Sequence, residues 1–430
     1  MLVRVSWLRI NREFLIVFLS FLVQISLAIF LGHYYDTKVS MATGFLVASG
    51  RNPYQQFDVS NVFPNPLLGG VAPIIGYPPL WPLFLGLAFR LSYGVIPNLF
   101  LYNFAIKVPI IAGNIGLAYM VKSLLGKLNA PVKKTRMAWL FLLFNPFILL
   151  TTAAWGQFDT IVALLCVASL YFLSKGRSEE CALTLALSVA LKPITLPLIG
   201  LPFLFSSAET PRKNLRYLLF FVAFLFAFLI APFYLLGWSR PFTSDELTAH
   251  FRMAGGMTPF NLVEILQNSF TLPAGFELLG YLWLPAVMVG YYAVYRKRPN
   301  SMSELVLAAI GLILIFFLTR SWLSEPNINL ILPLLLIAVA LNKLDWRSLQ
   351  LSWIVPLVFM FLNVAFAQLF FLLYPSVLES IVNFDLQFGG YRLVARFVVT
   401  VLWQILAWSI VYKVLVRHPK ERSLPANNQG

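Results

Sequence analysis

Long runs of apolar residues dominate the chain, and short polar or charged stretches separate them. A run of about 20 apolar residues is long enough to cross a bilayer as one helix. The pattern predicts about twelve spans, of which the first three are 14–32, 99–121 and 137–150. Outer-membrane barrels show short segments of alternating hydrophobicity instead. We therefore expect an all-α, polytopic transmembrane bundle.

One apolar stretch, 181–205, has charged loops at both ends and a Lys192-Pro193 pair near its middle. Proline interrupts helices because it lacks the backbone N–H and clashes with the preceding turn. The stretch is therefore predicted to enter the membrane and return as two short helices that meet near Lys192. The Pro-rich stretch 77–94 is too short to span comfortably and is expected to be interfacial or re-entrant.

The charges follow this topology. The predicted inner segments hold 22 of the 32 basic residues but only 7 of the 17 acidic ones. Cytoplasmic loops carry an excess of Lys and Arg, so both termini are predicted to be cytoplasmic. The net charge of +15 is thus a topology signal and does not indicate a nucleic-acid partner.

The pattern favours one membrane module over residues 1–416, with a first span that is retained and not cleaved as a signal peptide. Its outer loops are predicted at about 33–98, 237–278 and 373–391. The polar tail 417–430 is expected to be disordered and cytoplasmic. The two cysteines and three scattered histidines give no disulfide framework and no histidine-based metal cluster.

The stretch 145–173 is apolar but contains Asp159, close to Trp155 and Gln157. A charge at the centre of a spanning helix costs about 2.5–3.5 kcal/mol on insertion scales. The predicted topology places Asp159 in the outer turn between the third and fourth helices, and not at the centre of a spanning helix. There it is either part of an ordinary interfacial loop or a site residue that faces an outer cavity.

Four stretches together resemble the GT-C superfamily of membrane glycosyltransferases, nearest the mannosyltransferase branch that includes GPI mannosyltransferase I and prokaryotic relatives. They are "YYDTKVSMATGFLVASGRNPY", "GYPPLWPLFL", "NPFILLTTAAWGQFDT" and "LSVALKPITLPLIGLP", and their order and spacing are similar over roughly residues 30–205. The resemblance implies a GT-C-like bundle that uses a polyprenyl-phosphate or dolichyl-phosphate sugar as donor.

Such a reaction needs a carboxylate to take the proton of an acceptor hydroxyl and cationic groups to stabilise the leaving phosphate. The resemblance places the catalytic acid at Asp36, directly after the first helix; the alternative is a solvated charge at the helix exit. The family often has paired acids at this position, whereas this chain has Asp36 alone. A bound divalent metal, Mg or Mn, is therefore not assigned and stays open.

The remaining candidates are expected to bind substrate. Asp159 and Gln157 could contact sugar hydroxyls, and Lys192 could bind phosphate or extend to the interface. Arg320 could grip phosphate bidentately, with Glu325 orienting it or binding sugar. Lys107 could pair with an outer carboxylate or phosphate, or extend to the interface.

The segment "HFRMAGGMTPF" adds Arg252 and His250 as further phosphate or acceptor contacts, unless it is a solvated turn. Its two glycines would allow a close approach of backbone to ligand.

The expected function is transfer of a hexose, with mannose favoured, to an acceptor hydroxyl on the outer or lumenal membrane face. The acceptor could be a lipid, a glycan or a protein. The alternative is a multispan transporter or lipid-linked-sugar flippase without transferase activity. A transporter should place charges mid-membrane, whereas the polar candidates here gather on one predicted face. A prokaryotic plasma membrane is favoured over the endoplasmic reticulum.

Overall fold

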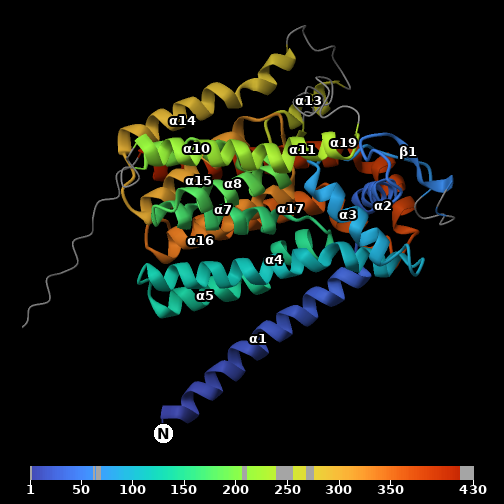
Figure 1. Ribbon diagram of the computed structural model, residues 1–430. Helices are drawn as coiled ribbons and strands as arrows, with labels where there is room; N and C mark the ends of the chain where they lie inside the picture. The colour runs from blue at the N-terminus through green and yellow to red at the C-terminus, as the bar shows by residue number, and fades with distance from the viewer. Residues whose placement is uncertain are drawn as a thin grey trace, which may run out of the picture.

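A computed structural model describes residues 2–61, 63, 69–205, 211–238, 255–267 and 276–416 of the chain. The described part is an all-α bundle, as the sequence predicts. Figure 1 shows the helices running roughly side by side, with α2, α3 and β1 gathered at the end of the bundle opposite the N-terminus. This arrangement separates a long helical body from one compact end.

The N-terminal half supplies the elements around that end. Their bounds are α1 Leu2–Phe30, α2 Tyr34–Ala48, β1 Phe57–Asp58, η1 Val59–Asn61, β2 Val71–Ala72, α3 Leu80–Leu91, α4 Leu99–Lys127, α5 Val132–Phe144, α6 Pro146–Leu149, η3 Leu150–Ala154, α7 Asp159–Ser174, α8 Ser178–Leu191, η4 Pro193–Leu198 and α9 Leu201–Leu204.

The C-terminal half adds further helices and one short parallel strand pair. Its elements are α10 Pro211–Leu225, η6 Phe226–Ile230, α11 Ala231–Leu235, β3 Gly255–Gly256, α13 Asn261–Gln267, η7 Phe276–Tyr281, α14 Trp283–Lys297, α15 Met302–Thr319, β4 Trp322–Leu323, η8 Glu325–Leu330, α16 Leu332–Ala340, α17 Trp346–Leu362, α18 Ala365–Gln368, α19 Val377–Val411 and η9 Tyr412–Val416.

Seven helical stretches within the described residues are long and apolar enough to cross a membrane. They are Arg12–Phe30, Leu99–Lys127, Val132–Ala154, Pro211–Leu235, Leu278–Lys297, Met302–Thr319 and Val377–Val416. Shorter apolar helices cover Leu80–Leu91, Asp159–Ser174, Pro193–Leu204, Glu325–Ala340 and Trp346–Leu362. The chain is therefore a multi-pass membrane protein, and the predicted number of twelve spans stays a prediction.

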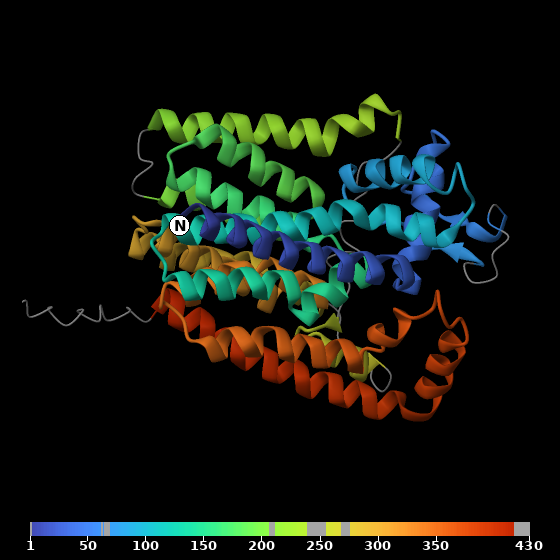
Figure 2. The same cartoon turned by 90° about the horizontal axis from the view of Figure 1, so that it is seen from below.

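The burial of these helices differs sharply. In α15 83% of the most apolar window is buried, against 17% in α1 and in the stretch that contains α10. Large apolar side chains such as Phe14 and Leu219 are exposed on the outer helices. In Figure 2 the α17–α19 pair lies along one side of the bundle and α10 along the opposite side. An apolar exterior around an apolar core is what a lipid environment requires.

Three predicted boundaries differ from the structure. The first helix begins at Leu2, well before residue 14. The third predicted helix, 137–150, is broken after Phe144, because Asn145 adopts an extended backbone and its side chain caps α6 by accepting from the N–H of Ile148. The predicted third outer loop, 373–391, is mostly helical and belongs to the long α19. Polar residues mark a solvated segment but do not by themselves forbid a helix.

The break at Lys192 is as predicted. α8 ends at Leu191, Lys192 has an extended backbone (φ −154°, ψ 118°), and Pro193 begins the 3-10 helix η4. Proline is favoured at the first helical position, where no N–H is needed. The stretch 181–205 therefore consists of short helical pieces that meet at Lys192.

The Gly-Gly pair of the second predicted outer loop packs closely against another strand. β3 pairs in parallel with β4, so that Gly255 faces Trp322 and Gly256 faces Leu323. A Cβ on Gly256 would lie 2.2 Å from the carbonyl oxygen of Leu323. Both glycines also have positive φ, which other residues rarely adopt. The pairing holds the segment that begins at Gly255 beside the segment that follows Arg320.

Candidate functional site

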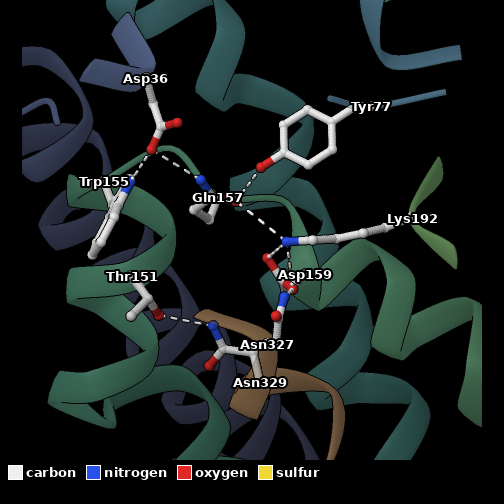
Figure 3. Close-up of polar contacts among 9 residues, drawn as sticks. All are labelled: Asp36, Tyr77, Thr151, Trp155, Gln157, Asp159, Lys192, Asn327 and Asn329. Carbon is white, nitrogen blue, oxygen red and sulfur yellow. Dashed lines mark hydrogen bonds and ion pairs between the residues drawn. The ribbon is translucent and has the colours of Figure 1, made fainter. Parts of the chain in front are cut away.

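Asp36 lies in the first turn of α2, three residues after His33, in the short connection that follows the end of α1. Its Oδ2 accepts hydrogen bonds from Trp155 Nε1 and, at 3.0 Å, from Gln157 Nε2 (Figure 3). His33 Nδ1 lies 3.3 Å from the same oxygen. All of these contacts use one carboxylate oxygen, and 28% of the side chain is exposed.

These contacts fix the charge of Asp36. Burial alone would raise the pKa of its carboxyl group. The hydrogen bond and charge interaction with His33, together with the hydrogen bonds from Trp155 and Gln157, outweigh burial and hold that pKa below its ordinary value. Asp36 is therefore a stable carboxylate at neutral pH, ready to accept a proton.

The donors to Asp36 come from a turn that the local sequence shapes. The chain leaves α6 through η3, a π-helix, and such helices recur at functional sites. Gly156 follows with φ +98°, a conformation that favours glycine. This turn points Trp155 and Gln157 toward Asp36, and the indole of Trp155 stacks on His33 with ring centroids 4.1 Å apart.

Behind Asp36 lies a buried ion pair. Lys192 Nζ donates to both carboxylate oxygens of Asp159, at 2.9 and 2.8 Å. Asp159 is fully buried and the Lys192 side chain is 10% exposed. Asn327 Nδ2 donates to Asp159 Oδ1 at 2.9 Å. The carboxylate that the sequence places inside an apolar stretch thus has a cation and an amide as partners.

Gln157 connects the two carboxylates. Its Nε2 donates to Asp36, while its Oε1 accepts from Tyr77 at 3.0 Å and from Lys192 at 3.4 Å (Figure 3). Because both donors point at the oxygen, the amide nitrogen is turned toward Asp36. Burial, with the nearby charges of Asp36 and Asp159, raises the pKa of Tyr77 well above its ordinary value, so its hydroxyl stays a donor.

Arg320 and Glu325 flank β4. The Arg320 guanidinium carbon lies 5.0 Å from the centre of the Phe316 ring, and no described carboxylate pairs with it. Glu325 is buried, and its Oε1 accepts from Asn363 Nδ2 at 2.9 Å. Among the described contacts Glu325 is bound to Asn363, and its role in orienting Arg320 or binding sugar stays a prediction.

Two predicted site residues, His250 and Arg252, lie outside the residues that the structure describes. Lys107 is described, and two of its three predicted alternatives, a carboxylate partner and extension to the interface, are wrong. It is fully buried in α4, and its Nζ donates to backbone carbonyls, not to a carboxylate. A lysine in an apolar helix can be satisfied by the free carbonyls of neighbouring helix ends.

Sequence reasoning assigned no role to several residues that the structure brings to the site: His33, Tyr77, Trp155, Asn327 and Asn363. Among these residues, Asn327 is the one that the sequence marks most clearly as a candidate, because it is a polar residue within the apolar stretch that follows Glu325. Buried amides in such stretches need a hydrogen-bond partner. Nothing in the sequence says that this partner is Asp159.

In the comparison with protein families, residues 39–208 match the family described as alpha-(1->6)-mannopyranosyltransferase, N-terminal domain. This part of the chain is similar to that mannosyltransferase family. The resemblance to GT-C glycosyltransferases is thereby confirmed. None of the curated proteins compared with the chain matches it.

The mannosyltransferase-family segment contains Tyr77, Gln157, Asp159 and Lys192. Asp36 lies three residues before it, and Arg320 and Glu325 lie beyond it. The family match supports a glycosyltransferase, of the mannosyltransferase type. Among the described residues no three His, Cys, Asp or Glu side chains gather closely enough to hold a metal ion.

Proposed function

We propose that the chain transfers a mannosyl residue from a polyprenyl-phosphate donor to an acceptor hydroxyl on the outer membrane face, with Asp36 as the base. One observation carries this proposal. Asp36 Oδ2 is held by Trp155 and Gln157, whereas no described residue bonds Oδ1, and the side chain is partly exposed. One oxygen anchors the carboxylate and the other is free for a substrate proton.

In the proposed reaction the acceptor oxygen attacks the anomeric carbon while its proton moves to Asp36 Oδ1. The bond from that carbon to the phosphate oxygen breaks, and polyprenyl phosphate leaves with the electron pair. The phosphate needs cationic stabilisation and no strong acid, so one carboxylate suffices. A glycosidase would need two carboxylates flanking the bond. Direct displacement inverts the anomeric configuration.

Arg320 is our candidate for the donor phosphate. Guanidinium groups bind phosphate through two parallel hydrogen bonds, and this one has no carboxylate partner among the described residues. Gln157, Asp159 and Lys192 hold one another and Asp36, so we assign them first to support of the base. Their direct contacts with sugar or phosphate stay predictions, as do those of Glu325, His250 and Arg252.

The membrane face follows from charge. The basic connections after α4, α7 and α14 lie at the end of the bundle that also holds the N-terminus, while α2 lies at the opposite end (Figure 1). Basic segments favour the cytoplasmic side. This supports an outward-facing Asp36, and a prokaryotic plasma membrane is our proposed location.

The test offers the purified protein a panel of polyprenyl-phosphate sugars with membrane lipid extract and identifies products by mass. We expect product from the mannosyl donor and none from the Asp36→Asn variant, which should still bind donor. Asp58→Asn is the matched control, because among the described residues the Asp58 side chain accepts only from the N–H of Ser60 in its own loop. Wild-type turnover in Asp36→Asn would reject the proposal, and movement of the lipid without transfer would favour a flippase.

A further inference from the structure

Helix α4 carries three buried polar residues on one face. Asn103, Lys107 and Asn114 are at most 2% exposed, and spacings of four and seven residues align them along the helix. Asn114 Nδ2 donates to Gln24 of α1 at 2.7 Å and to Thr152 of η3 at 2.8 Å. This face of α4 therefore lies against the two elements that lead into the site.

Lys107 joins the ends of those two elements. Its Nζ donates to the carbonyl of Leu31, just past the end of α1, at 2.5 Å. It also donates to the carbonyl of Ala154, the last residue of η3, at 2.7 Å. Asp36 follows the first carbonyl within five residues, and Trp155 directly follows the second. One side chain thus connects the base to the turn that supplies its donors.

The backbone beside Lys107 is shaped to admit it. A Cβ on Gly156 would lie 3.1 Å from the Cε of Lys107, which is tighter than ordinary packing. Gly156 stands between the two donors to Asp36, Trp155 and Gln157. The Lys107 stem therefore packs directly beneath the turn, in addition to bonding its preceding carbonyl.

We propose that Lys107 is a positioning residue that holds the Trp155–Gln157 turn within hydrogen-bonding distance of Asp36. It thereby keeps this carboxylate in the geometry that it needs as the base of the proposed transferase reaction. The inference rests on the proposed function for its catalytic meaning, but the geometry that it claims can be measured separately. Without Lys107, the end of η3 loses its tie to α1, and the hydrogen bonds to Asp36 loosen.

Asn103 provides a matched control one helical turn away. Its Nδ2 donates to the carbonyls of Ala28 and Leu31, at 2.7 and 2.8 Å, and so binds the same end of α1. None of its described contacts reaches η3. Asn103→Ala therefore removes a buried hydrogen-bonding side chain of α4 while leaving the Lys107 connection in place.

The first readout is the pH dependence of carbodiimide modification at Asp36, followed by peptide mass. Carbodiimides react with the protonated carboxyl, so the midpoint reports its pKa. In Lys107→Met, loss of the stabilising hydrogen bonds should move the midpoint upward by about one pH unit. The other titratable groups that face Asp36 are His33, Tyr35 and Tyr77, and the Lys192–Asp159 pair lies beyond Gln157. The Lys107→Met variant leaves all of these groups in the chain.

The second readout is steady-state kinetics with the mannosyl donor. Lys107→Met should lower kcat at least tenfold with little change in donor KM, because the phosphate contact is elsewhere. Asn103→Ala should leave the midpoint unchanged. If Lys107→Met does not fold, Lys107→Gln replaces it, since its shorter amide cannot reach both carbonyls.

Three results overturn the inference: an unshifted midpoint in the folded Lys107 variant, an equal shift in Asn103→Ala, or a kcat like that of the wild type. These outcomes are separate from failure of the proposed function. If Asp36→Asn keeps full turnover, the base assignment fails whatever Lys107 does. If Asp36→Asn is inactive and Lys107→Met is normal, only the role of Lys107 fails.

Discussion

The buried pair of Lys192 and Asp159 permits a sharp prediction about stability. The Lys192 ammonium bonds both oxygens of a carboxylate that is fully buried. Removing one partner of a buried pair leaves an uncompensated charge and costs about 3–5 kcal/mol. We therefore expect Lys192→Met to lower the free energy of unfolding by about that amount.

Asp159 would keep only one described polar partner in that variant, because Asn327 Nδ2 remains at 2.9 Å. One amide hydrogen bond to a charged group contributes about 1.5–3 kcal/mol and cannot replace the lysine. Asp159→Asn combined with Lys192→Met removes both charges, so the double variant should be more stable than Lys192→Met alone. The pair should therefore show a coupling energy of about 2 kcal/mol or more in a double-mutant cycle.

The assay is reversible unfolding of the purified protein in mixed micelles, with far-UV circular dichroism as the probe. The control is the exposed pair of Arg177 and Glu180, whose side chains are 55% and 35% exposed. Exposed pairs contribute about 0.2–1 kcal/mol, so Arg177→Met should cost little. If Lys192→Met costs no more than Arg177→Met, or if the cycle shows no coupling, the reasoning is refuted.

Two further predictions concern the site and its orientation. The pKa of Asp36 lies below its ordinary value, so the carboxylate persists at neutral pH and protonates only as the pH falls through that lowered pKa. The acid limb of kcat/KM against pH, which reports the free enzyme, should therefore lie below the ordinary aspartate value of about 4, and a limb near neutral pH would contradict the assignment. In a chain freed of its native cysteines, single cysteines at 36 and 130 should react with an impermeant thiol reagent from opposite sides of the membrane, and labelling from the same side would reject the topology.

The hydrophobic pattern predicts the fold class and several local features correctly, for identifiable reasons. Long apolar runs have few alternatives to helices in lipid, because every backbone polar group must be satisfied internally. The break at Lys192 follows from Pro193, whose missing N–H cannot continue a helix. The break at Asn145 was missed, although Asn followed by Pro is a start signal that the sequence displays.

The partners within the site were harder to predict, because they come from distant parts of the chain. Asp159 and Lys192 are 33 residues apart, and Asn327 is 168 residues from Asp159. Periodicity describes neighbours along one helix and carries no information about which helices meet. Lys107 shows the same limit, since its partners are backbone carbonyls, which every residue possesses.

Helix α19 has a consequence for access to the site. Its 35 residues make it about 52 Å long, whereas the hydrocarbon layer is about 30 Å thick. An upright helix of this length would project about 20 Å beyond the lipid. The first part of α19 lies at the end of the bundle that α2 occupies, so this projection stands beside the end that holds Asp36 (Figure 2). A bulky acceptor would have to pass around it, so this helix could select substrates by shape without touching the reacting atoms.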